Sequence, residues 1–584
     1  MTDIVRIAGA SGFWGDTDAA TEQLLACPQL DYIIYDYLSE ITLALLARAR
    51  AKCPTAGYVP DFQRAVAPHL AAIKAKGVRL LTNAGGLNPA ACAQALEAAA
   101  AEAGVSLRVA AVTGDDVMNA LPADAVDMFS GRPLPDDILS ANAYLGAAGM
   151  VAALADGADV VITGRCADSA LTLAPLIHDF GWAFDDWDRL AQGSLAGHLI
   201  ECGSQGAGGL FTDWRKVCDG WSDMGFPIAV CTADGAFEIT KPEGSGGRIT
   251  PLSLTEQMLY EIGDPADYRL PDVVCDFRQV TLDATGRDSV RVSGARGSPA
   301  PTDYKVSVTW QDGWRLTAIM MIGGREAAAK AHHVGRAILE RTQRLGARQG
   351  LSPLVRTDVE TLGAEVSYGP HARTGDTREV VLKIAATADD PAILQLLSRE
   401  IFPSATAMAP GITGVAGGRP SPSPLIRGGA VLTPRAAAPV VVTMGGASRP
   451  VALTDAPVGA RRAPSQDVED RRFNAPPRPL HGTLIDLAAA RSGDKGDLIN
   501  IGVAARSPEA FEILLHHLTA DRVGIYLAHL GADRVERFSL PGSRSLNFLL
   551  HGALKGGGMA NLRFDAQGKA VAQMLLDMPL ASLG

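Results

Sequence analysis

Acidic side chains follow two β-like segments of the chain. Asp36 ends the apolar run 32–36, Glu40 comes four residues later, and Asp168 follows the run 159–163. Ligands of open α/β sheets bind at the carboxyl ends of strands, where a carboxylate can donate or accept a proton. We therefore predict Asp36, Glu40 and Asp168 as catalytic acids or bases. For Glu40 the alternative is structural, because an acidic residue in the first turn stabilises a helix.

Two further turns carry groups that could hold an anionic substrate. Asn83, Gly85 and Gly86 follow the run 78–82, and Arg165 lies three residues before Asp168. A guanidinium group suits carboxylate or phosphate, and exposed glycine amides can donate to the same groups. We predict Asn83, Gly85, Gly86 and Arg165 as substrate-binding residues. An internal Arg165–Asp168 ion pair is the alternative.

A glycine-rich turn joins the first strand-like run to a helical segment. It contains Gly9, Ser11 and Gly12, and Asp36 lies near the ribose-recognition distance of a dinucleotide fold. Amides at a helix start attract anions, so we predict that these three residues contact the substrate. Asp16 counts against a pyrophosphate here because its charge would repel the ligand, and capping of the helix by Asp16 is the structural alternative.

Residues 201–209 form a second glycine-dense segment, in which Gln205 is a predicted substrate-binding residue. Cys202 could be a nucleophile if His198, one helical turn earlier, activated it. A small buried side chain is the more ordinary role of such a cysteine.

Charged residues alternate in the segment 490–497, which separates two strand-like runs. Arg491 and Lys495 alternate there with Asp494 and Asp497. We predict that Arg491 and Lys495 bind the substrate through a polyphosphate group such as that of coenzyme A. Internal salt bridging is the alternative.

The elements that position these residues alternate between strands and helices over the first 240 residues. The strand-like runs are 4–8, 32–36, 78–82, 106–112 and 159–163. Such alternation is typical of βαβ units. The predicted fold class is α/β, with a mainly parallel Rossmann-like sheet and helices on both faces.

The pattern changes after residue 240 and predicts an adjoining α+β region over 241–454. The expected elements are adjacent strands at 304–310 and 315–322 with a turn at Asp312-Gly313, a helix over 325–345, a strand at 379–385, a helix over 392–401 and a further strand at 439–444. Together with the first 240 residues this region makes a first domain, 1–454.

Proline separates this domain from a final unit. Residues 455–480 contain five prolines without helical or strand periodicity, which predicts a linker. Residues 481–584 are predicted to form one small α/β sandwich.

Composition excludes several classes of protein. The net charge of −11 disfavours nucleic acid and anionic membranes as partners. The eight dispersed cysteines and the absence of a signal-like start predict a cytoplasmic protein, and no motif predicts a metal site. Helices rich in alanine and glycine are compatible with a homo-oligomer.

Taken together, these segments resemble a known family. The segments that carry the resemblance are 9–18, 36–40, 82–89, 164–169, 201–209, 241–247, 491–497 and 555–558. They are similar to the acyclic terpene utilisation family of the AtuA type, with its N-terminal domain followed by a ferredoxin-fold-like C-terminal domain. The resemblance implies the catabolism of branched carboxylic acids as coenzyme A thioesters, by hydration, dehydration or carbon–carbon cleavage.

Three functions are therefore considered. The leading hypothesis is an acid–base enzyme acting on a branched acyl-CoA small-molecule substrate, with coenzyme A present only as part of that substrate. An NAD(P)-dependent oxidoreductase is the first alternative, although the chain lacks a Tyr-x-x-x-Lys pair. A non-catalytic subunit that scaffolds a partner enzyme is the second. All depend on one spatial prediction, that the turns near residues 12, 36, 85 and 165 meet at one site.

Overall fold

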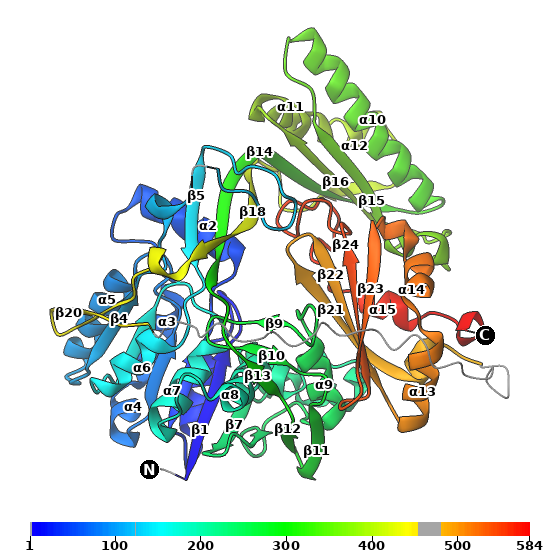
Figure 1. The fold of residues 1–584 in the computed structure, drawn as a ribbon. Helices are drawn as coiled ribbons and strands as arrows, with labels where there is room; N and C mark the ends of the chain where they lie inside the picture. The colour runs from blue at the N-terminus through cyan, green and yellow to red at the C-terminus, as the bar shows by residue number, and fades with distance from the viewer. Residues whose placement is uncertain (1–2, 123, 454–480, 584) are drawn as a thin grey trace.

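A computed structural model describes residues 3–122, 124–453 and 481–583. Figure 1 shows three bodies: the first sheet and its helices at lower left, a lobe at the top, and the C-terminal domain at lower right. The predicted linker, 455–480, lies outside the described residues. No helix in the described ranges is both long and apolar enough to cross a membrane.

The first sheet is mixed. Its strand order is β11-β12-β8-β7-β1-β2-β3-β6-β4-β19-β20. The strands are β1 (Ile4–Ser11), β2 (Tyr32–Tyr35), β3 (Arg79–Thr82), β4 (Val109–Thr113), β6 (Val160–Thr163), β7 (Ile228–Thr232), β8 (Phe237–Thr240), β11 (Thr281–Gly286), β12 (Ser289–Ser293), β19 (Val441–Met444) and β20 (Ala447–Pro450).

Only the centre of this sheet is parallel. The pairs β1–β2, β2–β3, β3–β6 and β6–β4 are parallel, and every other neighbouring pair is antiparallel. In a dinucleotide-binding fold the strand order reverses at the first strand, which has a parallel neighbour on each side. Here β1 has the parallel β2 on one side and the antiparallel β7 on the other. The α/β class is confirmed, whereas a mainly parallel, Rossmann-like sheet is not.

Helices cover both faces of the parallel centre. Side chains alternate along each strand, so that Ile7 and Ile34 enter one core and Ala8 and Ile33 the other. The helices of the second core are α1 (Ala19–Leu25), α2 (Glu40–Lys52), α3 (Asp61–Val66), α4 (Leu70–Lys76) and α5 (Pro89–Glu102), and those of the first are α6 (Ala148–Ala155), α7 (Ala170–Phe180) and α8 (Trp187–Ile200). This arrangement leaves the strand ends as the accessible edge for polar chemistry.

One long strand joins this body to the lobe. β14 runs unbroken from Asp303 to Gly323, where the sequence predicts two strands and a turn. At Asp312-Gly313 the chain bulges instead, since its pairing with β18 (Ser423–Pro434) shifts register between Gln311 and Trp314. A bulge adds residues to one strand without reversing it, which explains the difference from the prediction.

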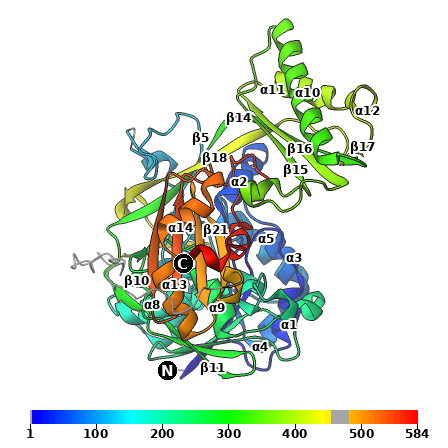
Figure 2. The ribbon, with the colours of Figure 1, turned by 90° about the vertical axis from the view of Figure 1, so that its right-hand side faces the viewer.

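The lobe packs helices on a sheet built around the upper half of β14 (Figures 1 and 2). Its elements are α10 (Ala327–Arg348), β15 (Arg356–Leu362), β16 (Glu379–Ala388), α11 (Pro391–Ile401), α12 (Ser404–Ala407) and β17 (Ile412–Val415). The lower half of β14 pairs with β18 and with β5 (Ile138–Ala143). A small separate sheet, formed by β9 (Tyr268–Arg269), β10 (Val274–Asp276) and β13 (Arg296–Ser298), packs against α8.

The C-terminal domain is a four-stranded antiparallel sheet of order β21-β22-β24-β23 with helices on one face. Its elements are β21 (Ala488–Lys495), β22 (Leu498–Ala505), α13 (Pro508–His517), α14 (Ala520–Tyr526), β23 (Arg534–Leu540), β24 (Ser545–His551) and α15 (Val571–Leu576). The other face lies on α9 (Pro251–Leu259). A Cβ at Gly502 would stand 2.2 Å from the Leu259 Cβ, so this glycine allows the close approach.

Candidate active site

Asp36 and Asn83, at the ends of β2 and β3, form a bonded pair. The Asn83 amide Nδ2 donates to Asp36 Oδ1 at 2.6 Å, and its Oδ1 accepts from the Tyr37 N–H at 2.8 Å. Burial raises the pKa of Asp36 well above its usual value, and the negative charges of Asp168 and Glu201 add to this effect. The raised pKa favours the protonated form of Asp36, and Asn83 fixes the orientation of its carboxyl group.

Arg165 and Asp168 stand at the end of β6. Arg165 Nη1 donates to the Leu38 carbonyl at 2.7 Å and to Asp168 Oδ1 at 3.0 Å, whereas its buried Nε has no partner among the described residues. Burial raises the pKa of Asp168 to about 6, although the positive charge of Arg165 opposes the rise. A carboxyl group of that pKa changes protonation close to neutral pH, as a general base must.

Asp115, which the sequence analysis did not single out, is hydrogen-bonded to the turn that contains Arg165. Its Oδ2 accepts from the Arg165 N–H at 2.9 Å and from Asn142 Nδ2 at 2.8 Å. A Cβ at Gly164 would lie 2.4 Å from Asp115 Oδ1, so only glycine fits there. Asp115 therefore positions Arg165.

Glu40, the first residue of α2, remains ionised. It accepts from the Tyr144 hydroxyl at 2.9 Å. Burial would raise the pKa of Glu40, but the charges of Lys305 and Arg165 outweigh that effect and lower it to about 2. Glu40 is in consequence a counter-ion for these cations and a weaker candidate acid or base than Asp36 or Asp168.

The C-terminal domain contributes Lys495, at the end of β21. Its ammonium group donates to the Glu261 carbonyl at 3.0 Å and lies 5.3 Å from the centre of the Tyr268 ring. Burial lowers the pKa of Lys495, and the nearby positive charge of Lys305 lowers it further. The site is thus shared between two domains.

We call the group Asp36, Glu40, Tyr144, Arg165, Asp168, Lys305 and Lys495 the charged cluster. The environments of its carboxyl groups shift their pKa values apart: the pKa of Asp36 is raised well above its usual value, that of Asp168 is raised to about 6, and that of Glu40 is lowered to about 2. Carboxyl groups whose pKa values are pushed apart are the usual arrangement for acid–base catalysis.

The first glycine turn does not belong to the cluster. A Cβ at Gly9 would lie 2.0 Å from the Ile200 carbonyl oxygen, and one at Gly12 would lie 2.7 Å from the Cys202 carbonyl carbon. The Gly9 N–H donates to Pro227, and the Gly12 N–H donates to Asp16. Both amides already have acceptors within the protein, so the geometry does not favour the predicted binding of substrate by these amides, nor a phosphate site of a dinucleotide.

The other predicted backbone donors are also used internally. Ser11 Oγ donates to the Asp36 carbonyl at 3.1 Å, and the Gly86 N–H donates to the Asn83 carbonyl at 3.1 Å. A Cβ at Gly85 would stand 2.6 Å from the Thr163 carbonyl oxygen. These residues pack the strand ends together so that Asp36 and Asn83 can meet, and do not face a ligand themselves.

Cys202 lacks an activating base. The ring nitrogens of His198 lie 3.1 Å from Glu201 Oε1 and 3.1 Å from the Met258 carbonyl. Burial, with the charge of Glu201, raises the pKa of the Cys202 thiol well above its usual value. The thiol is therefore un-ionised at neutral pH, which contradicts the nucleophile hypothesis.

Gln205 and Arg491 brace the two domains. The Arg491 guanidinium donates to Gln205 Oε1 and stacks 4.5 Å from the centre of the Tyr260 ring. Arg491 lies inside β21 and is buried, whereas the sequence places it in a loop. Both side chains are engaged in contacts between the domains, which leaves the predicted substrate contact of Gln205 and the predicted coenzyme contact of Arg491 without support. Lys495 is the residue of this segment that we place in the charged cluster.

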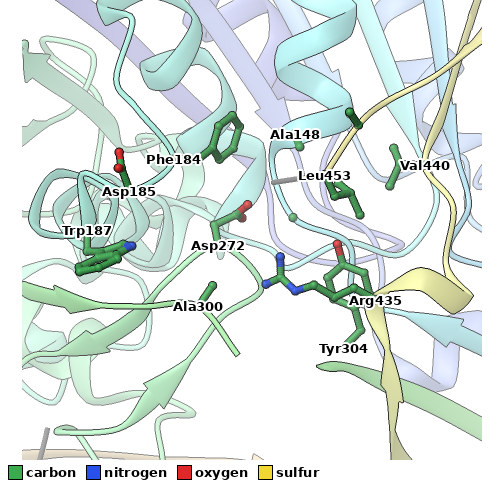
Figure 3. A pocket seen from close by; sticks show the side chains of 13 residues that line it. Ala148, Phe184, Asp185, Trp187, Asp272, Ala300, Tyr304, Arg435, Val440 and Leu453 are labelled. Atoms are coloured by element: carbon green, nitrogen blue, oxygen red, sulfur yellow. The ribbon is translucent and has the colours of Figure 1, made fainter. Parts of the chain in front are cut away.

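A cavity of about 450 Å³ lies on the other side of β14. Tyr304 lines it, while the next residue, Lys305, belongs to the charged cluster, and successive side chains of a strand point to opposite faces. Figure 3 shows the Arg435 guanidinium between the Tyr304 ring and the Asp272 carboxylate, with Trp187 and Phe184 on the far wall. The cavity contains none of the predicted site residues.

Among the described residues, no three histidine, cysteine, aspartate or glutamate side chains are grouped as a metal ion would require. The structure thus defines a class: a mixed α/β protein with a separate four-stranded C-terminal domain, and between the two a half-buried cluster of acids and cations.

The chain belongs to the acyclic terpene utilisation family. The family model described as acyclic terpene utilisation family protein AtuA matches residues 5–444, and that of the AtuA ferredoxin-like domain matches residues 482–581. No curated protein matches the chain. The resemblance inferred from the sequence is confirmed, and membership associates the chain with acyclic terpene utilisation.

Proposed function

We propose that the protein is an acid–base enzyme of branched-chain carboxylic acid catabolism whose substrate is an acyl-CoA thioester. The observation that carries this proposal is that Asp36, whose pKa is raised well above its usual value, and Asp168, whose pKa is about 6, influence each other and both feel the charge of Arg165. Family membership supports the pathway. Coenzyme A enters as part of the substrate.

In the proposed reaction Asp168 removes the proton from the carbon next to the thioester carbonyl. The electron pair moves onto the carbonyl oxygen, where the Nε–H of Arg165 can donate to the developing negative charge. In dehydration, Asp36 donates its proton to the hydroxyl group that leaves from the next carbon as the double bond forms; hydration is the reverse. In carbon–carbon cleavage, Asp168 instead removes the proton of that hydroxyl group, the adjacent carbon–carbon bond breaks to give the enolate, and Asp36 protonates the carbon next to the thioester carbonyl. The enolate that Arg165 stabilises is common to all three reactions.

Exchange of the substrate's α-protons tests this proposal without knowledge of the complete reaction. The purified chain is incubated in D₂O with methyl-branched acyl-CoA thioesters, and deuterium uptake is followed by mass spectrometry. Uptake that disappears in Asp168→Asn but persists in Asp36→Asn, because Asp36 acts only after the α-proton is removed, is the expected result. It should also persist in the control Asp159→Asn, whose side chain pairs with Lys74 on the surface.

A non-catalytic subunit would give a different outcome. It would show no exchange in isolation and would co-purify with a partner enzyme. The homo-oligomer expected from the alanine- and glycine-rich helices stays a prediction, which light scattering would test.

A further inference from the structure

Lys305 shares its counter-ion, Glu40, with Arg165 and has no direct ion pair of its own among the described residues. Its ammonium group lies 4.8 Å from the centre of the Tyr144 ring and 5.9 Å from that of Phe129. Among the residues that the structure describes, none accepts a hydrogen bond from it and no carboxylate lies within 4.0 Å. Lys569 shows the contrast, because it binds Glu261 at 2.8 Å and Asp494 at 3.1 Å.

Lys495 approaches the same place from the C-terminal domain. Its one hydrogen bond in the described part of the chain goes to a backbone carbonyl, that of Glu261. A Cβ on the next residue, Gly496, would lie 3.5 Å from the Phe129 ring. Phe129 thus lies between the Lys305 ammonium group and the backbone that follows Lys495, and the positive charge of Lys305 is close enough to act on Lys495. The direct contacts of the two ammonium groups are with aromatic rings and a backbone carbonyl.

The charges that face this pair are mixed. Glu40, Asp168 and Asp127 attract the Lys305 ammonium group and Arg165 repels it, while Glu261, Asp168 and Glu40 attract Lys495. The Arg165 Nε–H, buried and without a partner in the described ranges, adds one more donor to the cluster. The ammonium groups of Lys305 and Lys495 and the Nε–H of Arg165 thus lack a side-chain acceptor among the described residues. Burying such donors costs folding free energy unless an acceptor binds them.

We propose that Lys305 and Lys495 form an anion-binding pair, completed across two domains, for a carboxylate or phosphate group of the substrate. The proposal rests on the proposed function and specifies its substrate further. The anion is either a second carboxylate on the acyl chain or a phosphate of the coenzyme, and an ammonium group binds both through the same charge-assisted hydrogen bonds.

Calorimetric titration of the whole protein with malonate, inorganic phosphate and coenzyme A tests the pair without any turnover. The variants are Lys305→Met and Lys495→Met, and the control is Lys74→Met, because Lys74 forms a surface ion pair with Asp159. Loss of one charged hydrogen bond should weaken binding about tenfold to a hundredfold. Arginine at either position should restore most of the affinity, and thermal unfolding checks that each variant is folded.

Malonate binding that both methionine variants lose identifies the anion as an acyl carboxylate. Binding of phosphate or coenzyme A alone, lost in the same variants, identifies it as a coenzyme phosphate. No binding, or affinities that neither folded variant changes, overturns the pair. Anion binding is measured without turnover. If the wild-type protein binds an anion and both methionine variants lose that binding, while the wild-type protein shows no α-proton exchange, the proposed function is refuted and the anion-binding pair stands.

Discussion

Replacing Asp168 by asparagine removes the proposed base and keeps the shape of the side chain. The amide oxygen can still accept the 3.0 Å hydrogen bond from Arg165 Nη1, and Arg165 keeps its second bond to the Leu38 carbonyl. The substitution should therefore abolish proton transfer without disturbing the turn after β6. General-base catalysis contributes about 10²- to 10⁴-fold, so the rate should fall by that factor.

The pH dependence gives a sharper expectation. With a pKa of about 6, about one tenth of Asp168 is ionised at a pH one unit lower, so wild-type kcat/KM should fall about tenfold there. Asp168→Asn should show a low rate without this acid limb. Asp168→Glu should recover part of the rate and the limb.

Folding should change little. Because the folded pKa of Asp168 exceeds the usual 3.8, the ionised group destabilises the fold, and this destabilisation grows as pH rises from about 4 to about 6. The shift corresponds to about 3 kcal/mol, but the side chain is 34% exposed, and solvent screening reduces the effect to about 1 kcal/mol. Weakened pairing with Arg165 offsets that gain.

The assay is α-proton exchange measured between pH 4.5 and 8.5, with urea unfolding of each variant alongside. The reasoning is refuted if Asp168→Asn, folded like wild type, exchanges at the wild-type rate or retains the limb near pH 6. A lost rate accompanied by a lost fold would be resolved by Asp168→Glu, which must then be folded and active.

Three further predictions concern the supporting residues. Asp115→Asn should raise the free energy of unfolding by about 1–2 kcal/mol at pH 8 and by less at pH 5, as urea titrations at both pH values would measure. The reason is that burial raises the pKa of Asp115 to about 6, so that its ionised form destabilises the folded protein. Arg165→Lys should reduce exchange about tenfold to a hundredfold with folding retained, because lysine cannot supply both the Nη1 donor that binds Leu38 and Asp168 and the separate Nε–H proposed to face the substrate; equal rates would contradict the assignment. Gly502→Ala should destabilise the protein by about 1–3 kcal/mol and expose the domain junction to proteases, because its Cβ would meet Leu259, whereas Gly350→Ala, which meets no atom within 4 Å, reports the effect of backbone strain alone.

Local patterns in the sequence predict the parallel centre of the sheet well. The runs 32–36, 78–82 and 159–163 correspond to β2, β3 and β6, and the polar groups at their ends do meet. The antiparallel flanks could not be predicted in this way, because pairing between residues as distant as 113 and 441 leaves no periodic signal.

Glycine was the misleading signal. A glycine that faces a ligand and one that allows two segments to touch look alike in the sequence, and Gly9, Gly12 and Gly85 are of the second kind. Lys305 and Tyr144 were missed for the opposite reason, since each lies in an ordinary strand or loop without a motif. The strand-like pattern around Lys305 predicts that its side chain points to the opposite face from that of Tyr304, but it does not indicate which residues lie on that face.

The outer strands of the first sheet come from late in the chain. The edge strands β19 and β20 follow the whole lobe, and β11 and β12 lie beyond residue 280. The lobe is accordingly an insertion within a discontinuous domain. A fragment ending at residue 240 would expose β4 and β8 as bare sheet edges and would be prone to aggregate. A fragment intended for crystallisation should therefore extend to residue 450. During synthesis, β4 cannot acquire its neighbour β19 until the ribosome has passed that point.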